Sequence, residues 1–233
     1  MSELRDLDEP RSRRDRPAKP PLSRAVITEA ALELVRQDGL DAVTLRKVAD
    51  RLDTGPASLY VYVANREELL ERMFDRVLAE VPVVAVNKRW WRERLVELFS
   101  GMLAALDRYP GIAQAGLGSM STTPGGLAIA ENALALLCAG GVADQAAAWA
   151  CDALLLHTVA TGVEHAIERR PTLPGHKSPD RDYVGAAREL FRSLPSDRYP
   201  NLSRMAVTMT TGGDTERFEF GLNALIHGAR EGY

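Results

Sequence analysis

The chain has only two cysteines in 233 residues, few aromatic side chains (6%) and no excess of basic over acidic residues. Two cysteines cannot form a disulfide framework or a four-cysteine metal site, and we interpret Cys138 and Cys151 as small buried hydrophobic residues. No apolar run approaches the roughly 18–20 residues that cross a bilayer, and residues 1–24 are too polar for a secretory signal. The composition therefore predicts a cytoplasmic protein with no membrane partner.

The overall composition is typical of a globular protein, with 45% hydrophobic and 26% charged residues. There are 29 lysine and arginine residues against 32 aspartate and glutamate residues, so the formal net charge is -3 and the isoelectric point is about 5.9. This balance excludes a protein that binds nucleic acid through an overall positive charge. Any nucleic-acid-binding surface must therefore be a local one.

Residues 1–22 contain four prolines, many charges and almost no apolar periodicity, which predicts a flexible arm. Between residues 11 and 24, six basic side chains face one acidic side chain, giving a local net charge of +5. Such an arm can follow phosphates or enter a minor groove, as the N-terminal arms of other helical DNA-binding proteins do. It can equally be a solvated tail, and the sequence leaves both interpretations open.

Apolar residues recur at helical spacing along the rest of the chain, and no segment shows the alternation of a strand. Ser23, Thr44 and Asn65 are suited to cap the first, second and fourth helices, and Pro82 ends the fourth. The pattern predicts an all-α protein of nine or ten helices, at about residues 22–39, 44–52, 55–63, 65–81, 91–106, 125–138, 143–169, 183–194, 202–209 and 215–230. We expect three parts: an arm at 1–22, a first domain at 23–81 and a second at 82–233.

The first three predicted helices form a bundle that contains a helix-turn-helix. The second helix is barely two turns long, Asp53 begins a tight turn, and Pro56 occupies the favoured first position of the third helix. Small residues at the start of the third helix let the backbone approach base edges, and its tyrosine hydroxyls reach phosphates. The start of the second helix suits a phosphate oxygen, and Arg66 would flank the groove.

The candidate DNA-contacting residues are therefore Thr44, Arg46, Lys47, Gly55, Pro56, Ala57, Ser58, Tyr60, Tyr62 and Arg66. Residues 44–66 carry a net charge of +2, whereas residues 23–81 as a whole have eight basic and eleven acidic side chains. For any single residue, packing of the tyrosines or a solvated charged face is an equally good interpretation. The coincidence of helix lengths, caps and turn favours an interface for the set as a whole.

Residues 22–81 resemble the DNA-binding domain of the TetR family of transcriptional regulators. The resemblance lies in ALELVRQDG (31–39), VTLRKVADRL (43–52), ASLYVYV (57–63) and NREELL (65–70). The second half is similar to the tetracycline-repressor branch, through the long helix at 143–169 and RFEFGLNALI (217–226). Asp53 stands where the family usually has glycine, and aspartate tolerates a left-handed backbone better than most residues.

The resemblance implies an Ω-shaped homodimer whose two recognition helices enter successive major grooves of double-stranded, palindromic operator DNA. It also implies C-terminal helical domains that dimerise and bind a small-molecule effector, with repression as the family default. The expected dimer interface is a four-helix bundle from residues 143–169 and 215–230 of both chains, with small residues and an apolar seam. Its candidate residues are Ala146, Ala150, Ala153, Phe218, Leu222, Leu225 and Ile226.

An effector pocket should be mainly apolar with a few polar groups. The candidate residues are Phe99, Met102, Leu103, Leu106, Gln114, Leu117, Met120, Trp149, His157 and Thr161. The tetracycline repressor holds its drug through magnesium on a histidine in the segment that matches residues 110–116, and this segment has no histidine here. We therefore expect an effector other than magnesium-tetracycline. His157, Glu164 and His165 are too far apart along a helix to chelate an ion together, so we expect no metal and no cofactor.

Two other classes of function compete with a regulator. An enzyme is disfavoured because the sequence has no glycine-rich phosphate loop, no nucleophile motif and no HExxH zinc motif. A helical adaptor that uses its helix-turn-helix only for packing is disfavoured by the small polar residues at the start of the third helix.

Overall fold

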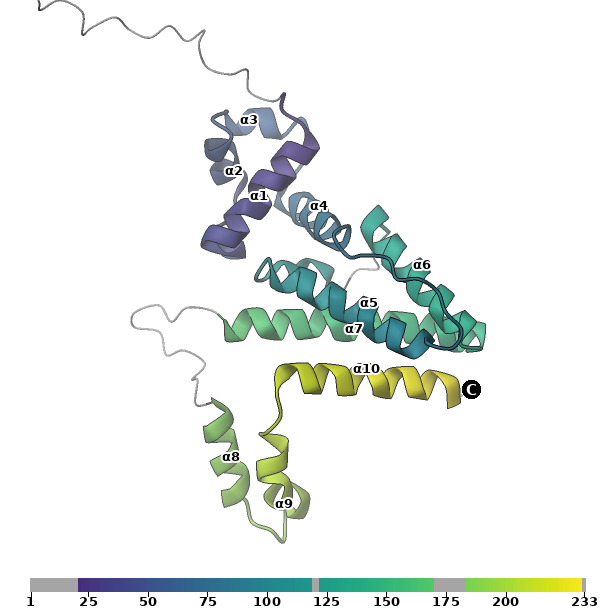
Figure 1. Cartoon of the computed structure of the whole chain (residues 1–233). Helices are drawn as coiled ribbons and strands as arrows, with labels where there is room; N and C mark the ends of the chain where they lie inside the picture. The colour runs from purple at the N-terminus through teal and green to yellow at the C-terminus, as the bar shows by residue number, and fades with distance from the viewer. Residues whose placement is uncertain (1–20, 119–121, 170–182, 232–233) are drawn as a thin grey trace, which may run out of the picture.

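The computed structural model describes residues 21–118, 122–169 and 183–231, and within these ranges all regular secondary structure is helical (Figure 1). The all-α prediction is confirmed. The elements are α1 (Arg24–Asp38), η2 (Leu40–Ala42), α2 (Leu45–Arg51), α3 (Pro56–Leu59), α4 (Arg66–Leu78), α5 (Trp91–Asp107), η3 (Ile112–Gly116), α6 (Pro124–Ala139), α7 (Asp144–Glu168), α8 (Tyr183–Ser193), α9 (Pro200–Met209) and α10 (Asp214–Glu231). Almost all of the predicted N-terminal arm lies outside the described residues.

The head of the molecule comprises α1 to α4, and its helices begin where their caps predict. A side-chain oxygen of Ser23, Thr44 and Asn65 accepts the backbone N–H three residues further on, at 3.2, 3.2 and 2.8 Å. These bonds satisfy donors that the first turn of a helix leaves unpaired. Glu68 adds a second bond by accepting the N–H of Ala64 at 2.7 Å. This bond and the guanidinium of Arg72 lower the pKa of Glu68.

The third helix is shorter than the sequence predicts. It was expected to continue to Val63, but the structure ends α3 at Leu59, and residues 60–62 form a turn. The backbone N–H groups of Tyr62 and Val63 both donate to the carbonyl of Leu59. Leu59 and Val63 are still the buried residues of this segment, as the sequence predicts, because the turn returns Val63 to the core.

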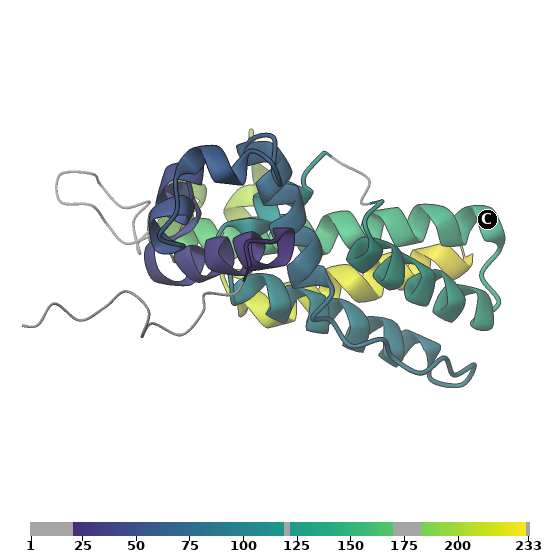
Figure 2. The same ribbon diagram turned by 90° about the horizontal axis from the view of Figure 1, so that it is seen from above.

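The body of the molecule comprises α5, η3, α6, α7 and α10. Seen from above in Figure 2, these helices form a layered bundle with the head over one end. The central helix α7 packs against α5, α6, η3 and α10. Among the described residues, α7 alone is long and apolar enough by composition to span a membrane. Its packing on four neighbouring elements is that of a core helix.

The helices α8 and α9 form a hairpin that projects from the body on the side opposite the head (Figure 1). They pack mainly against each other. Arg188 joins them by donating from Nε to Thr210 Oγ1 at 2.7 Å and from Nη2 to the Thr210 carbonyl at 2.8 Å. Apolar side chains on both helices are exposed, among them Leu190 and Val207.

Candidate nucleic-acid interface

The turn between α2 and α3 fixes the direction of the third helix. Asp53 has a φ of 49°, the left-handed conformation expected for it. Thr54 donates its backbone N–H to the carbonyl of Ala49 at 3.0 Å, which closes the end of α2. Gly55 then caps α3 in an extended conformation, with Pro56 at the first helical position.

The tip of α3 is exposed along its whole outer side. Gly55, Pro56, Ala57 and Ser58 are all exposed, whereas Leu59 is fully buried and anchors the helix to the core. With no large side chain on this surface, the α3 backbone can come close to a partner. The structure therefore brings four predicted residues together on one accessible surface, next to the start of α2.

The two tyrosines after α3 differ in their surroundings. The side chain of Tyr60 is 57% exposed and belongs to the open surface. Tyr62 is partly buried and packs against the hydrophobic core, and its carbonyl accepts a hydrogen bond from Nε of Arg24 at 3.1 Å. The packing interpretation thus fits Tyr62, and the surface interpretation fits Tyr60.

The start of α2 supplies exposed polar groups beside the α3 tip. Thr44, Arg46 and Lys47 are all exposed. Thr44 Oγ1 accepts the N–H of Lys47, and its own O–H remains a donor that can reach a phosphate oxygen. Arg46 and Lys47 have no ion-pair partner within the described parts of the chain, whereas Arg51 is held by Glu33 at 3.8 Å. The positive charge of this surface therefore rests on two residues.

Arg66 lies at the start of α4, where the sequence predicts, but its guanidinium is already engaged inside the head. Nε donates to the carbonyl of Val43 at 3.0 Å and Nη2 to the carbonyl of Leu40 at 3.3 Å. These two carbonyls belong to the connection between α1 and α2, so Arg66 ties α4 to that connection. These bonds help to place α2.

Arg24 makes a contact within the head that the sequence did not predict. Its charge was assigned to the basic arm, but the structure uses its guanidinium to hold the carbonyl of Tyr62, 38 residues away in the sequence. A bond between α1 and the turn after α3 leaves no local pattern that could have revealed it.

Comparison with known proteins identifies this arrangement. A family model described as "Bacterial regulatory proteins, tetR family" matches residues 27–73, and one described as "Tetracyclin repressor-like, C-terminal domain" matches residues 85–233. The chain belongs to the TetR family. The family consists of transcriptional regulators rather than enzymes, and this protein is a ligand-responsive regulator of the repressor type.

Relatives of this TetR-family regulator cover almost its full length. The HTH-type transcriptional repressor DrrR1 of Streptomyces coeruleorubidus is 29% identical over 93% of this chain and 80% of its own. The tetracycline repressor protein class G of Vibrio anguillarum is 28% identical over 89% and 93% of the two chains. The structure of Streptomyces coelicolor ActR in complex with actinorhodin superposes with a TM-score of 0.79, at 31% identity, covering 91% of this chain and 97% of ActR.

The predicted effector residues of the regulator do not all surround one cavity. Phe99, Met102, Leu103 and Leu106 are buried in the core of the body. Leu117 and Trp149 are exposed, at 44% and 52%, and Gln114 is exposed as well. Met120 lies outside the described residues. The sequence does not distinguish buried from exposed apolar positions here, because both occur at helical spacing.

The two remaining candidates make contacts within the body. His157 stacks on Phe218 of α10, with ring centroids 5.3 Å apart, and its Nε2 lies 3.2 Å from the Phe218 carbonyl. Thr161 donates its hydroxyl to the His157 carbonyl at 2.9 Å. His157 therefore helps to join α7 to α10, whereas the Thr161 bond lies within α7.

His165 is the polar group of the body that the candidate set omitted. Its Nδ1 lies 3.0 Å from both carboxylate oxygens of Asp107, and Arg169 donates to the same carboxylate at 3.1 Å. The other ring nitrogen, Nε2, is buried and has no hydrogen-bonding partner among the described residues. A buried polar atom without a partner is uncommon in a protein core.

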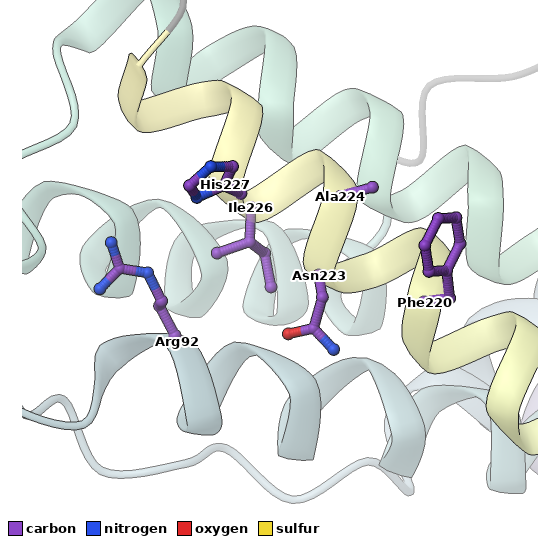
Figure 3. Close-up of a pocket in the computed structure, with 6 residues that line it drawn as sticks. All are labelled: Arg92, Phe220, Asn223, Ala224, Ile226 and His227. Carbon is purple, nitrogen blue, oxygen red and sulfur yellow. The ribbon is translucent and has the colours of Figure 1, made fainter.

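The surface hollows in the described parts of the regulator include a groove and a cleft. A groove between α5 and α10 is lined by Arg92, Phe220, Asn223 and His227, among others (Figure 3). A cleft of about 550 Å³ separates the end of α1 from the body, and Gln114 and Arg169 lie on its body side. Gln114 is the only predicted effector residue that lines either hollow.

The predicted dimer residues are mostly buried within one chain, in the core of the body. Their side chains therefore offer little surface to a second protomer, and their place in a dimer interface stays a prediction. The buried residues are Ala146, Ala150, Phe218, Leu222 and Ile226, while Ala153 and Leu225 are half-buried. The sequence identifies the apolar face of each helix but not which neighbouring helix covers it.

Proposed function

We propose that the protein binds double-stranded operator DNA as a homodimer, with α3 of each protomer in a major groove, and that a small-molecule effector releases it. The observation that carries this proposal is the exposed tip of α3, where the small residues 55–58 leave the backbone open to close approach by DNA. Arg46 and Lys47, which have no ion-pair partner in the described parts of the chain, lie beside it. Two-fold symmetry of the protein requires a palindromic operator with its half-sites about one helical turn apart or a multiple of that spacing.

The proposed DNA contacts divide into two groups. Thr44, Arg46 and Lys47 contact phosphates and set the register of the head. Ala57, Ser58 and Tyr60 lie against base edges and the adjoining backbone, with Gly55 and Pro56 allowing close approach. Because the head as a whole is acidic, weak non-specific affinity and a strong dependence on Arg46 and Lys47 follow.

The proposed dimer interface uses the exposed face of α7 and α10. On α7, Trp149 and Leu156 are 52% and 55% exposed, and on α10 Phe220 is 75% exposed. Large apolar side chains grouped on two neighbouring helices favour burial against another surface. The groove beside Phe220 and His227 lies between α10 and Arg92 of α5 (Figure 3). A second copy of these two helices would complete a four-helix bundle.

The proposed effector is a small organic molecule that enters the body. The actinorhodin complex of ActR, whose fold this chain shares, supports an organic effector. Residues 110–116, which include the whole of η3, have no histidine to hold magnesium, so the proposal does not include magnesium-tetracycline. Arrival of the effector must change the relative free energies of two head arrangements, because a ligand shifts an equilibrium only through differential affinity.

A gel-shift titration against DNA upstream of the protein's own gene tests DNA binding. We expect a specific shift at low salt, and the slope of log affinity against log salt to fall by about one for Lys47→Ala, because one phosphate contact is lost. Lys88→Ala removes an exposed lysine from the loop before α5 and serves as the matched control. No shift by the wild-type protein would reject the proposal, and equal slopes for the two variants would remove Lys47 from the interface.

A further inference from the structure

The head and body meet at a buried tyrosine. Tyr109 follows the end of α5, is 1% exposed, and donates its hydroxyl to Oε1 of Glu80 at 3.0 Å. Glu80 comes two residues after the end of α4. The hydrogen bond therefore joins the segment just after a head helix to the segment just after a body helix, 29 residues apart in the sequence.

Glu80 is the centre of a larger group of charges. Arg108 of the body donates from Nη2 to Oε2 at 2.7 Å, and Arg76 of α4 donates from Nη1 to Oε1 at 3.1 Å. Arg76 also reaches Glu29 of α1 at 2.6 Å. Burial opposes ionisation of Glu80, but the hydrogen bonds from Arg108 and Tyr109 outweigh it and hold the pKa of this carboxyl below its ordinary value.

The helix α1 reaches the same tyrosine independently. The Arg36 guanidinium lies over the Tyr109 ring, 4.5 Å from its centroid, and donates from Nη2 to the Tyr109 hydroxyl. A cation over an aromatic face and a hydrogen bond to its hydroxyl add to each other. Tyr109 thus holds α1 through Arg36 and the end of α4 through Glu80.

The surroundings explain why this contact matters. Within the head, α1 packs on η2, α2 and α4, whereas α4 also packs on α5, α6 and η3 of the body. Beside this contact, the 550 Å³ cleft lies between residues 35–41, at the end of α1 and the start of η2, and the body. Because α4 packs on three elements of the body, and the segment from α1 to η2 meets the body through Arg36 on Tyr109 and through Leu40 beside Gly111, the Arg36–Tyr109 contact is one that limits rotation of α1 to α3 about α4.

We propose that Tyr109 is a positioning residue for operator binding, which sets the orientation of α1 to α3 on the body and hence the placement of α3. The inference rests on the proposed function for its effect on DNA, but its effect on orientation is independent of DNA. A body rearrangement that moves the end of α5 pulls on Arg36 and Glu80 together. Loss of the Tyr109 hydroxyl frees the head while leaving the ring in the core.

The test is Tyr109→Phe in the full-length protein, which keeps the buried ring and removes both hydrogen bonds. Tyr199→Phe is the matched control, because no hydrogen bond of the Tyr199 hydroxyl is present among the described residues. Spin labels are placed on Val61→Cys, at the exposed turn after α3, and on the native exposed Cys138 of α6. Labelled protomers are diluted with unlabelled protein so that pulsed EPR reports distances within one chain.

We expect a single narrow distance distribution for the wild type and for Tyr199→Phe, and a broadened or shifted distribution for Tyr109→Phe. Operator affinity, measured without labels, should fall about tenfold for Tyr109→Phe, the loss expected for one or two modest hydrogen bonds. Arg36→Gln cuts the contact from the α1 side and should broaden the distribution in the same way. Retained circular dichroism and thermal transitions would show that the variants fold.

Unchanged distance distributions in both Tyr109→Phe and Arg36→Gln would overturn the assignment. A broadened distribution with wild-type operator affinity would overturn the link between orientation and DNA binding. If the wild type binds no operator, the proposed function fails, while the EPR comparison still decides whether Tyr109 positions the head.

Discussion

Gly125, the second residue of α6, provides a sharp test of how the body is fixed to α4. Its N–H donates to Asp75 Oδ1 at 2.7 Å. A Cβ at this position would lie 2.6 Å from the Asp75 carbonyl oxygen, 2.8 Å from Asp75 Oδ1 and 2.9 Å from the Ala79 nitrogen. Two of these three atoms are backbone and cannot turn aside. Gly125→Ala must therefore push α6 away from α4.

The expected loss of stability can be worked from these contacts. Overpacking of a close contact costs about 1–3 kcal/mol, and weakening a hydrogen bond to a charged acceptor costs up to about 1.5–3 kcal/mol. The better helix propensity of alanine returns at most about 1 kcal/mol, and less in a first turn. The net expectation is a decrease of about 2 kcal/mol in the free energy of unfolding, or about 4–8 °C in Tm for a chain of this size.

Urea denaturation at fixed protein concentration measures this change. Gly101→Ala is the matched control, because Gly101 lies inside α5 and its added Cβ would meet only Val81 Cγ1, at 3.8 Å. That variant should be stabilised by up to about 1 kcal/mol through helix propensity. If Gly125→Ala is as stable as the wild type, or if both variants shift in the same direction, the close approach of α6 to α4 is not as described.

Three further predictions concern the interface, a carboxylate and the thiols. Leu156→Asp, at an exposed position of α7, should convert the dimer to a monomer in sedimentation experiments at micromolar concentration, and a persistent dimer would contradict the proposed face. Folding lowers the pKa of Glu80 from 4.5, so the contribution of its carboxylate to stability is present above the unfolded pKa and is lost as pH falls through the folded pKa. Glu80→Gln should therefore flatten the decline of Tm below about pH 5. An equally steep decline in the variant would contradict this role of Glu80. Burial raises the pKa of Cys151 to about 11, so iodoacetamide at pH 8 should modify the exposed Cys138 and spare Cys151, as read by mass spectrometry; equal modification would contradict this burial.

Local signals in the sequence predicted the helices and caps well. The Ser23, Thr44 and Asn65 caps each depend on residues within one turn, so the bonds could be anticipated from spacing alone. The left-handed backbone of Asp53 was likewise expected from its place in a tight turn. For the α2–α3 region, this information was enough to assemble most of the candidate surface.

Contacts between distant residues could not be predicted in the same way. The length of α3 was overestimated, since the helical spacing of Leu59 and Val63 does not reveal that Arg24 holds the Tyr62 carbonyl in a turn. Arg66 is directed inward by two carbonyls of the α1–α2 connection, which its own segment does not indicate. The apolar residues of α7 and α10 were assigned to a dimer interface. Helical periodicity identifies the apolar face of a helix, but it does not identify the helix that packs against that face.

The packing of α4 indicates that the boundary between the two parts that can move relative to each other lies before α4 rather than at Pro82. Pro82 marks a break in the sequence, but η3 and α6 both approach α4 closely at a glycine. A Cβ on Gly116 would lie 2.5 Å from the Phe74 ring, and one on Gly125 would lie 2.6 Å from the Asp75 carbonyl oxygen. Glycine-mediated contacts of this kind leave little freedom for sliding. If α4 moves with the body, then α1 to α3 form the mobile unit. Arg66 and Arg76 of α4 bond to this unit, and Arg36 of this unit bonds to Tyr109. An effector can therefore alter α3 in two distinct ways, by displacing α4 itself or by loosening the Arg36–Tyr109 contact while α4 stays in place.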